Sequence, residues 1–203
     1  MVGSDGDDTL LGGGGSDTLI GGGGEDVFVV DGGEDVIDGG AGRDALDFSA
    51  SASGVQVDLS TGTLVDGEGF GDHFTSIEIV TGSDATDMLV GGGGADTIFG
   101  GDGVDRLEGQ DGNDLLEGGA GADSLLGGDG DDTLIGGGGA DRMHGENGDD
   151  FIIGGNGDVI FANAGDDFIE LDGSVDPDLG RAFIDGNDAV SYTHLTLPTK
   201  VRV

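Results

Sequence analysis

Residues 12–20 read Gly-Gly-Gly-Gly-Ser-Asp-Thr-Leu-Ile, and residues 21–29 read Gly-Gly-Gly-Gly-Glu-Asp-Val-Phe-Val. When the two stretches are aligned, they share the pattern Gly-Gly-x-Gly-x-Asp-x-U-x, in which U is a large apolar residue. A short period that is sustained along a chain is typical of a solenoid, in which each repeat forms one small structural unit. The repeat, rather than any single element, therefore decides the fold.

The nonapeptide occupies two blocks, residues 3–47 with five copies and residues 82–170 with ten, one of them shortened by a residue near Gly157. The fourth position is Gly in fourteen copies, with Ala85 as the exception. The sixth position is Asp in all fifteen copies, at Asp8, Asp17, Asp26, Asp35, Asp44, Asp87, Asp96, Asp105, Asp114, Asp123, Asp132, Asp141, Asp150, Asp158 and Asp167. The eighth position is always apolar, at Leu10, Leu19, Phe28, Ile37, Leu46, Leu89, Ile98, Leu107, Leu116, Leu125, Leu134, Met143, Ile152, Ile160 and Ile169. Fifteen aspartates in phase cannot follow from an acidic composition alone.

Each copy is expected to combine a three-residue strand with a six-residue turn. Alternation along the strand directs the eighth side chain inward and its neighbours outward. The glycines permit the positive φ angles of a tight turn and leave the backbone carbonyl oxygens accessible. Two copies then complete one circuit, and the sequence predicts an all-β fold with two short parallel sheets facing each other across a thin core.

The composition points to divalent cations as partners. The chain has 203 residues with a formal charge of -37, and 49 of its residues are glycine. So dense an acidic charge disfavours nucleic acids and anionic membranes as partners, whereas calcium prefers six to eight carboxylate and carbonyl oxygens. Because there are no cysteines, disulfides and thiolate metal sites are excluded. No stretch has the length of a membrane helix, and no N-terminal signal sequence is visible.

The nonapeptide resembles the RTX (repeats-in-toxin), or hemolysin-type, calcium-binding repeat. The resemblance covers residues 3–170 and implies a right-handed parallel β-roll in which each ion lies between a turn and the next turn on the same edge, two copies later. Asp105 would then pair with Asp123, and Asp123 with Asp141, so that interior turns contact two ions and about eleven ions bind in all. The resemblance also implies backbone carbonyl ligands near Gly12, Gly15, Gly21, Gly24, Gly91, Gly94, Gly100, Gly103, Gly109, Gly112, Gly118, Gly121, Gly127, Gly130, Gly136 and Gly139.

Other chemistries are disfavoured by the residues present, and no catalytic or cofactor-binding residues are predicted. A phosphate-binding loop needs Gly-Lys-Ser/Thr, but the single lysine is Lys200. An EF-hand fails because Thr133 and Leu134 stand where an acidic residue and Gly are required. Neither His-Glu-x-x-His nor Gly-x-Ser-x-Gly occurs. The arginines are interpreted as surface charge partners, and His144 as a surface residue.

Residues 48–81 interrupt the repeat. Residues 54–59 and 74–80 alternate like strands, and similar segments occur in RTX-containing proteins. We expect longer strands that continue the stack and separate two calcium blocks, with a small independent module as the alternative. Residues 171–189 keep acid and glycine but lose the period, as a terminal cap does.

Residues 190–203 differ abruptly in composition, because glycine and acidic residues vanish together. The stretch Val190–Thr199 can be encoded by GTC TCT TAT ACA CAT CTG ACG CTG CCG ACG, which resembles a transposase-based sequencing adapter read into the insert. We therefore expect this tail to be non-native, with a short edge strand as the alternative. Independent long reads of the source DNA test this expectation.

The resemblance implies calcium-dependent folding outside the cell, after type I secretion of an unfolded chain. The uncleaved C-terminal secretion signal that is usual in such proteins is not found in this sequence. Three interpretations stay open for the parent protein: a folding module of a larger secreted protein, a secreted enzyme (protease, lipase or polysaccharide-modifying) whose catalytic domain lies elsewhere, or an adhesin or surface-layer protein. The sequence does not separate them, because one fold serves many activities.

Overall fold

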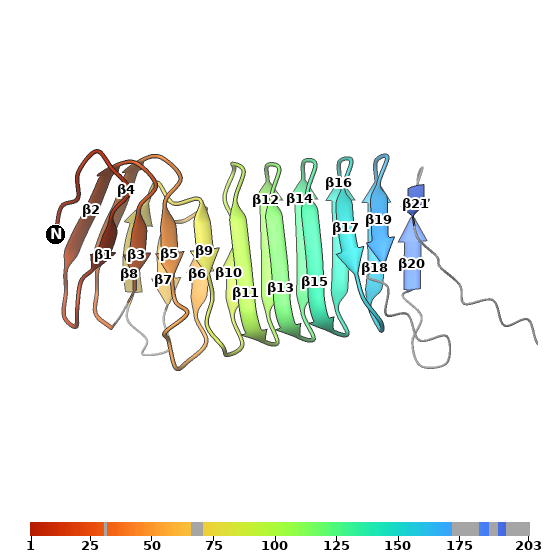
Figure 1. Cartoon of the computed structure of the whole chain (residues 1–203), viewed down its shortest axis with the longest axis horizontal. Coiled ribbons are helices and arrows are strands. Elements are labelled where there is room, and N and C mark those ends of the chain that lie inside the picture. The colour runs from red at the N-terminus through yellow and green to blue at the C-terminus, as the bar shows by residue number, and fades with distance from the viewer. Residues whose placement is uncertain (31, 66–70, 172–182, 187–190, 194–203) are drawn as a thin grey trace, which may run out of the picture.

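The chain forms a stack of flat coils in a computed structural model, which describes residues 1–30, 32–65, 71–171, 183–186 and 191–193. The described residues contain strands and no helix. Outside residues 48–81, successive strands lie on opposite sides of the stack. The stack extends along one axis from the N-terminus (Figure 1). The predicted all-β, parallel solenoid is therefore confirmed. No described helix has the length and apolar character needed to cross a membrane.

Two sheets run along the stack. The ten-stranded sheet contains, in spatial order, β1 (Thr9–Leu11), β3 (Val27–Val29), β5 (Ala45–Asp47), β9 (Ile79–Thr81), β11 (Thr97–Gly103), β13 (Leu115–Gly121), β15 (Thr133–Gly139), β17 (Phe151–Gly154), β19 (Phe168–Leu171) and β21 (Ser191–Thr193). The eleven-stranded sheet contains β2 (Thr18–Gly23), β4 (Val36–Ala41), β8 (Gly71–Thr75), β7 (Thr63–Val65), β6 (Gln56–Asp58), β10 (Met88–Val90), β12 (Arg106–Asp111), β14 (Ser124–Asp129), β16 (Arg142–Asn147), β18 (Val159–Ala164) and β20 (Phe183–Gly186). Consecutive repeats alternate between the sheets, so two repeats form each coil, as the period predicts.

The core consists of apolar side chains that both sheets direct into the space between them. All fifteen eighth-position residues are buried, with at most 2 % of their surface exposed. Leu125, for example, pairs with Leu107 on one side and Met143 on the other. Each such side chain contributes about 1.5–3 kcal/mol by its burial. One large side chain per nine residues is a thin core, so the turns must contribute much of the remaining stability.

The strands of the second block are longer than the sequence predicts. The strands β11, β13 and β15 each span seven residues rather than three, because the glycine half of each turn also pairs with its copy in the next coil. Gly101 pairs with Gly119, and Gly119 with Gly137. Identical turns are stacked in register, and their amides and carbonyls therefore continue the ladder around the edge.

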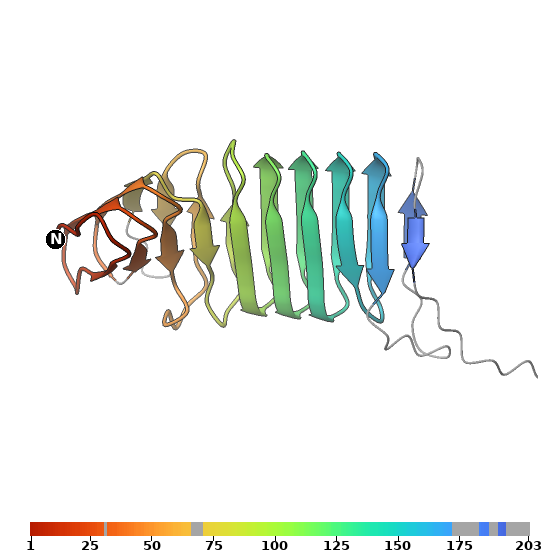
Figure 2. The same cartoon turned by 45° about the horizontal axis from the view of Figure 1, so that its top comes forward.

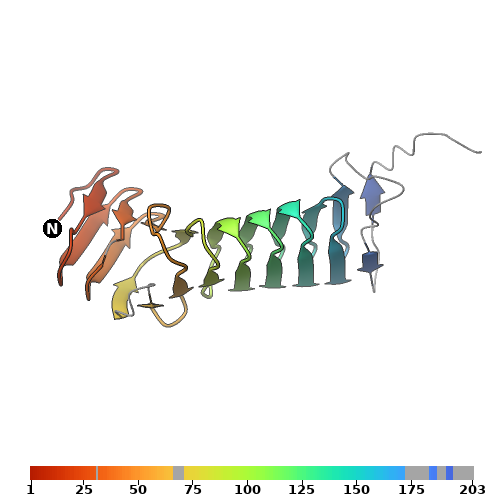
Figure 3. The same ribbon diagram turned by 90° about the horizontal axis from the view of Figure 1, so that it is seen from below.

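The interruption contributes three strands to the eleven-stranded sheet and one to the ten-stranded sheet. In the eleven-stranded sheet, β8 is parallel to β4, β7 is antiparallel to both β8 and β6, and β6 is parallel to β10. In the other sheet, β9 alone lies between β5 and β11. These strands are three to five residues long, and the expectation of longer strands is wrong. The coils before this segment are inclined relative to the regular coils that follow it (Figures 2 and 3).

The C-terminal segments are described only in part. The strand β20 pairs with β18 and lies in the expected cap, residues 171–189. The strand β21 pairs with β19 and lies in the stretch expected to be non-native. The remainder of residues 190–203 lies outside the described residues, and the adapter interpretation stays a prediction.

Candidate metal centre

The repeat aspartates form a column along each edge of the stack, at the start of the strands. In each column, the backbone N–H of one aspartate donates to Oδ1 of the aspartate two repeats later. Asp105 donates to Asp123 over 2.8 Å, and Asp123 donates to Asp141 over 2.9 Å. All eleven pairs expected from the n to n+2 spacing are joined in this way, namely 8–26, 17–35, 26–44, 87–105, 96–114, 105–123, 114–132, 123–141, 132–150, 141–158 and 150–167.

The second carboxylate oxygen, Oδ2, is buried in most of these turns without a hydrogen-bond donor. This holds for Asp26, Asp44, Asp105, Asp114, Asp123, Asp132, Asp141 and Asp150. In Asp8 and Asp87, by contrast, Oδ2 accepts the N–H of Ser4 and Ser83 over 2.7 Å. A buried charge without a compensating partner costs several kcal/mol. The unpaired oxygens therefore need a positively charged ligand.

Backbone carbonyl oxygens converge on the same places. A Cβ built on Gly100 would lie 2.7 Å from Asp105 Oδ2 and 2.5 Å from the carbonyl oxygen of Gly118, in the next turn on that edge. A Cβ on Gly118 would lie 2.7 Å both from Asp123 Oδ2 and from the carbonyl oxygen of Gly136. The first glycine of each repeat thus leaves open a space that oxygens from two turns surround.

The fourth glycine is required for a different reason. Gly121 has a φ of 153°, and a Cβ there would overlap the carbonyl oxygen of Gly103 in the preceding turn. A Cβ on Gly94 would meet no atom within 4 Å, and the turn that precedes it in the column is not a full-length repeat turn. The expected glycine carbonyls therefore lie at the turn-to-turn contacts, with their spacing set by the missing side chains.

The donor set fits calcium better than a transition metal. Among the described residues, no three His, Cys, Asp or Glu side chains form a group that could hold a metal ion. The gaps at Gly100 and Gly118 instead bring a carboxylate oxygen of one turn close to a carbonyl oxygen of the next. Calcium accepts such an all-oxygen shell of mixed origin, whereas structural zinc takes four side-chain ligands, mainly Cys and His.

A family model for the RTX calcium-binding nonapeptide repeat matches residues 2–36, 21–50, 81–116, 99–134, 108–143, 126–158 and 144–176. These ranges cover well over half of the chain. The chain belongs to the RTX calcium-binding repeat family. Among solved structures, the extracellular lipase LipA from Serratia marcescens is 28 % identical over 80 % of this chain and 32 % of its own, with a TM-score of 0.35. The chain thus spans about a third of that protein, and no curated protein matches it.

Burial raises the pKa of several repeat aspartates of this RTX roll in the absence of metal. It raises the pKa of Asp132 to about 7, and the neighbouring charges of Asp114 and Asp131 add to the effect. The pKa of Asp150 rises to about 7 for the same reasons, with Asp132 and Asp167 nearby. Burial also raises the pKa of Asp96, Asp105 and Asp141 to about 6. The columns therefore hold carboxylates whose ionised form is stabilised by a cation.

Two carboxylates outside the repeat join these columns, and the sequence analysis missed both. Asp35 N–H donates to Asp72 Oδ1 over 2.7 Å, and Asp44 N–H donates to Glu78 Oε2 over 3.0 Å. His73 and Ile79, which follow them, donate to the carbonyls of Asp35 and Asp44, as the residue after each repeat aspartate does. The signal that could have found them is an acidic residue two positions before a buried apolar one, even where the fourth position is not glycine, as with Phe70 and Ser76.

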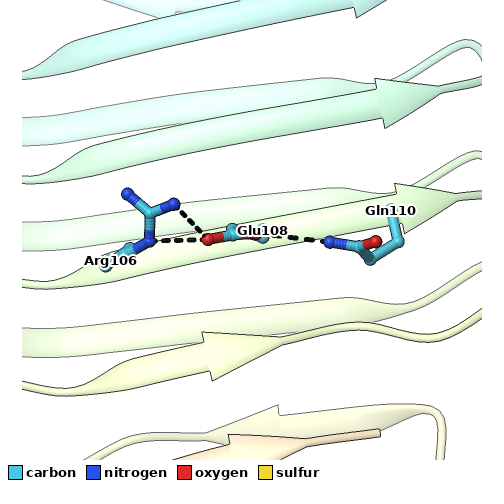
Figure 4. A network of polar contacts seen from close by, with 3 residues as sticks. All are labelled: Arg106, Glu108 and Gln110. Atoms are coloured by element: carbon cyan, nitrogen blue, oxygen red, sulfur yellow. Dashed lines mark hydrogen bonds and ion pairs between the residues drawn. The ribbon is translucent and has the colours of Figure 1, made fainter. Parts of the chain in front are cut away.

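Arg106 and Arg142 lie on the outer face of one sheet of the RTX roll, at the start of β12 and β16. Arg106 donates to Glu108 over 2.6 Å, and Gln110 donates to the other oxygen of Glu108 over 3.2 Å, all along β12 (Figure 4). The guanidinium of Arg142 lies over the Phe161 ring, 4.9 Å from its centroid. These contacts agree with the interpretation of the arginines as surface partners.

Proposed function

We propose that this RTX roll is a calcium-responsive folding module of a secreted bacterial protein. The observation that supports the proposal is the set of eight buried Oδ2 atoms without a donor, seven of which lie beside a backbone carbonyl of the adjacent turn. Ions held between turns n and n+2 would supply the missing partners, and about eleven ions would bind through the repeat pairs. Binding that occurs only in the folded state contributes directly to folding free energy.

The overall charge supports the same proposal. A formal charge of -37 on 203 residues opposes compaction, because the carboxylates repel one another at close spacing along each column. Divalent cations reduce that repulsion where it is strongest. A chain that stays unfolded at low calcium and folds at extracellular levels would suit secretion in an unfolded state. We expect dissociation constants on the order of 10⁻⁴–10⁻³ M, as in extracellular calcium modules.

Circular dichroism of the full chain, with calcium and with excess chelator, tests the proposal. We expect a β spectrum with millimolar calcium and loss of most of it on chelation. Magnesium at equal concentration is the matched control and should restore little structure, because it prefers a smaller octahedral shell and retains its waters. A β spectrum that persists in chelator would contradict calcium-dependent folding.

A further inference from the structure

The turn that joins β8 to β9 is a shortened version of the repeat turn. Phe74 pairs with Ile37, an eighth-position residue, and Val80 pairs with Leu46 and Ile98, which are also eighth-position residues. Phe74 and Val80 are thus six positions apart, whereas the core positions of consecutive regular repeats are nine apart. The shortened turn, residues 75–79, nevertheless lies in the column between the turns of Asp44 and Asp96.

The shortened turn reproduces both contacts of a regular turn with the turn before it. The Asp44 N–H donates to a carboxylate, Glu78 Oε2, over 3.0 Å, as Asp105 N–H donates to Asp123. A Cβ built on Gly39 would lie 2.6 Å from Asp44 Oδ2 and would overlap the carbonyl oxygen of Ser76. Ser76 therefore supplies the carbonyl that a first-position glycine supplies elsewhere, and it has a positive φ of 57°.

Asp44 supplies an independent sign that a ligand belongs here. Its side chain is fully buried, and Oδ2 has no hydrogen-bond donor. Only Oδ1 is engaged, by the N–H of Asp26 over 2.8 Å. If the metal column ended at Asp44, this oxygen would be an uncompensated buried charge at the end of the first block.

We infer that Asp44, the Ser76 carbonyl and Glu78 form a further calcium site, which carries one ion column across the interruption. The inference rests on the proposed calcium function and adds two ligand residues that lie outside the nonapeptide pattern. The site differs from its neighbours in using a glutamate, whose extra methylene spans part of the distance lost with the three missing residues.

A cavity lies on the other side of the shortened turn, between that turn and the turn of Asp96. Its volume is about 210 Å³, and its wall includes Ser76, Glu78, Gly93 and Asp96. The cavity arises because a six-residue segment is stacked against a nine-residue one. No residue of the Asp44 turn lines this cavity, so the site itself rests on Asp44, the Ser76 carbonyl and Glu78.

Glu78→Gln in the full chain tests the inference, because glutamine keeps an oxygen to accept the Asp44 N–H but loses the charge. Bound ions are counted by native mass spectrometry at saturating calcium. We expect Glu78→Gln to carry one ion fewer than the wild type. Glu117→Gln, which removes the same charge from the outer part of β13, should carry the wild-type number.

A second variant keeps the test valid if Glu78→Gln folds poorly. Asp44→Asn should lose two ions if the column continues to Glu78, and one if the column ends at Asp44. Equal ion counts for Glu78→Gln and Glu117→Gln, or a loss of one ion in Asp44→Asn, would overturn the site while leaving calcium binding by the repeats intact. A wild-type chain that binds no calcium would instead overturn the proposed function itself.

Discussion

Six of the ten repeat aspartates in the second block, the interior ones, give their two carboxylate oxygens different tasks. In Asp123, Oδ1 accepts the N–H of Asp105 over 2.8 Å, while Oδ2 is buried and has no donor. The first contact aligns consecutive coils without metal, and the second leaves a charge that only a cation can balance. A single side chain therefore sets the register and also makes that register depend on calcium.

Position within the column should determine the effect of losing one carboxylate. Asp123 pairs with both Asp105 and Asp141, whereas Asp8 pairs with Asp26 alone. In Asp123→Asn and Asp8→Asn, the amide oxygen can still accept the coil-to-coil hydrogen bond. We expect the calcium midpoint to rise about twice as far on a logarithmic scale for Asp123→Asn, with roughly tenfold weakening per site. Titration by circular dichroism measures both, and equal midpoints would count against the n to n+2 pairing.

The raised pKa values of the aspartates predict opposite pH effects with and without metal. In the metal-free chain, protonated Asp132 and Asp150 are favoured by folding, because burial raises their pKa from 3.8 to about 7. Their contribution to stability is complete below pH 4 and is lost as the pH rises through 7. We therefore expect more β structure in chelator at pH 5 than at pH 8, and a higher calcium midpoint at pH 5. A metal-free spectrum that is unchanged between these pH values would contradict the assignment.

At the scale of the element, the stacked turns should tolerate side chains only where no other turn lies alongside. Gly121 has a positive φ and lies against the Gly103 carbonyl, whereas a Cβ on Gly93 would meet no atom within 4 Å. We expect Gly121→Ala to lower the free energy of unfolding by about 1–3 kcal/mol, and Gly93→Ala to leave it nearly unchanged. Urea unfolding at saturating calcium measures both. Equal losses would mean that the close stacking of the turns is not what requires glycine.

The period predicts the repeating elements well and the exceptions poorly. The eighth-position core, the two sheets and the paired aspartates all follow from residues that recur every nine positions. The antiparallel strand β7 does not, because residues 63–65 lie outside both alternating runs, 54–59 and 74–80, from which strands were expected. Asp72 and Glu78 were missed because the fourth-position glycine is replaced, by Phe70 before Asp72 and by Ser76 before Glu78. Only their hydrogen bonds to the preceding coil place them in the columns. The strand lengths were underestimated because stacked turns continue the ladder.

At the scale of the whole molecule, calcium should change the dimensions of the chain as well as its spectrum. An unfolded chain of 203 residues has an expected radius of gyration of roughly 48 Å, and the charge of -37 should expand it further. The folded stack is far shorter than the extended chain. Small-angle scattering should therefore show the radius falling by roughly half when calcium is added to chelated protein. A radius that does not respond to calcium would argue against a global folding transition.

The unequal numbers of strands in the two sheets affect the direction in which the stack extends. Strands in a sheet lie about 4.8 Å apart, and facing sheets are separated by about 10 Å. The two additional strands β6 and β7 therefore lengthen one sheet by about 10 Å relative to the other, so the stack must bend at this point. The β6–β7 hairpin sets a fixed angle between the N-terminal coils and the C-terminal coils. Inserting or removing strands here would change the angle between the two groups of coils, while every metal-binding turn would keep its own geometry.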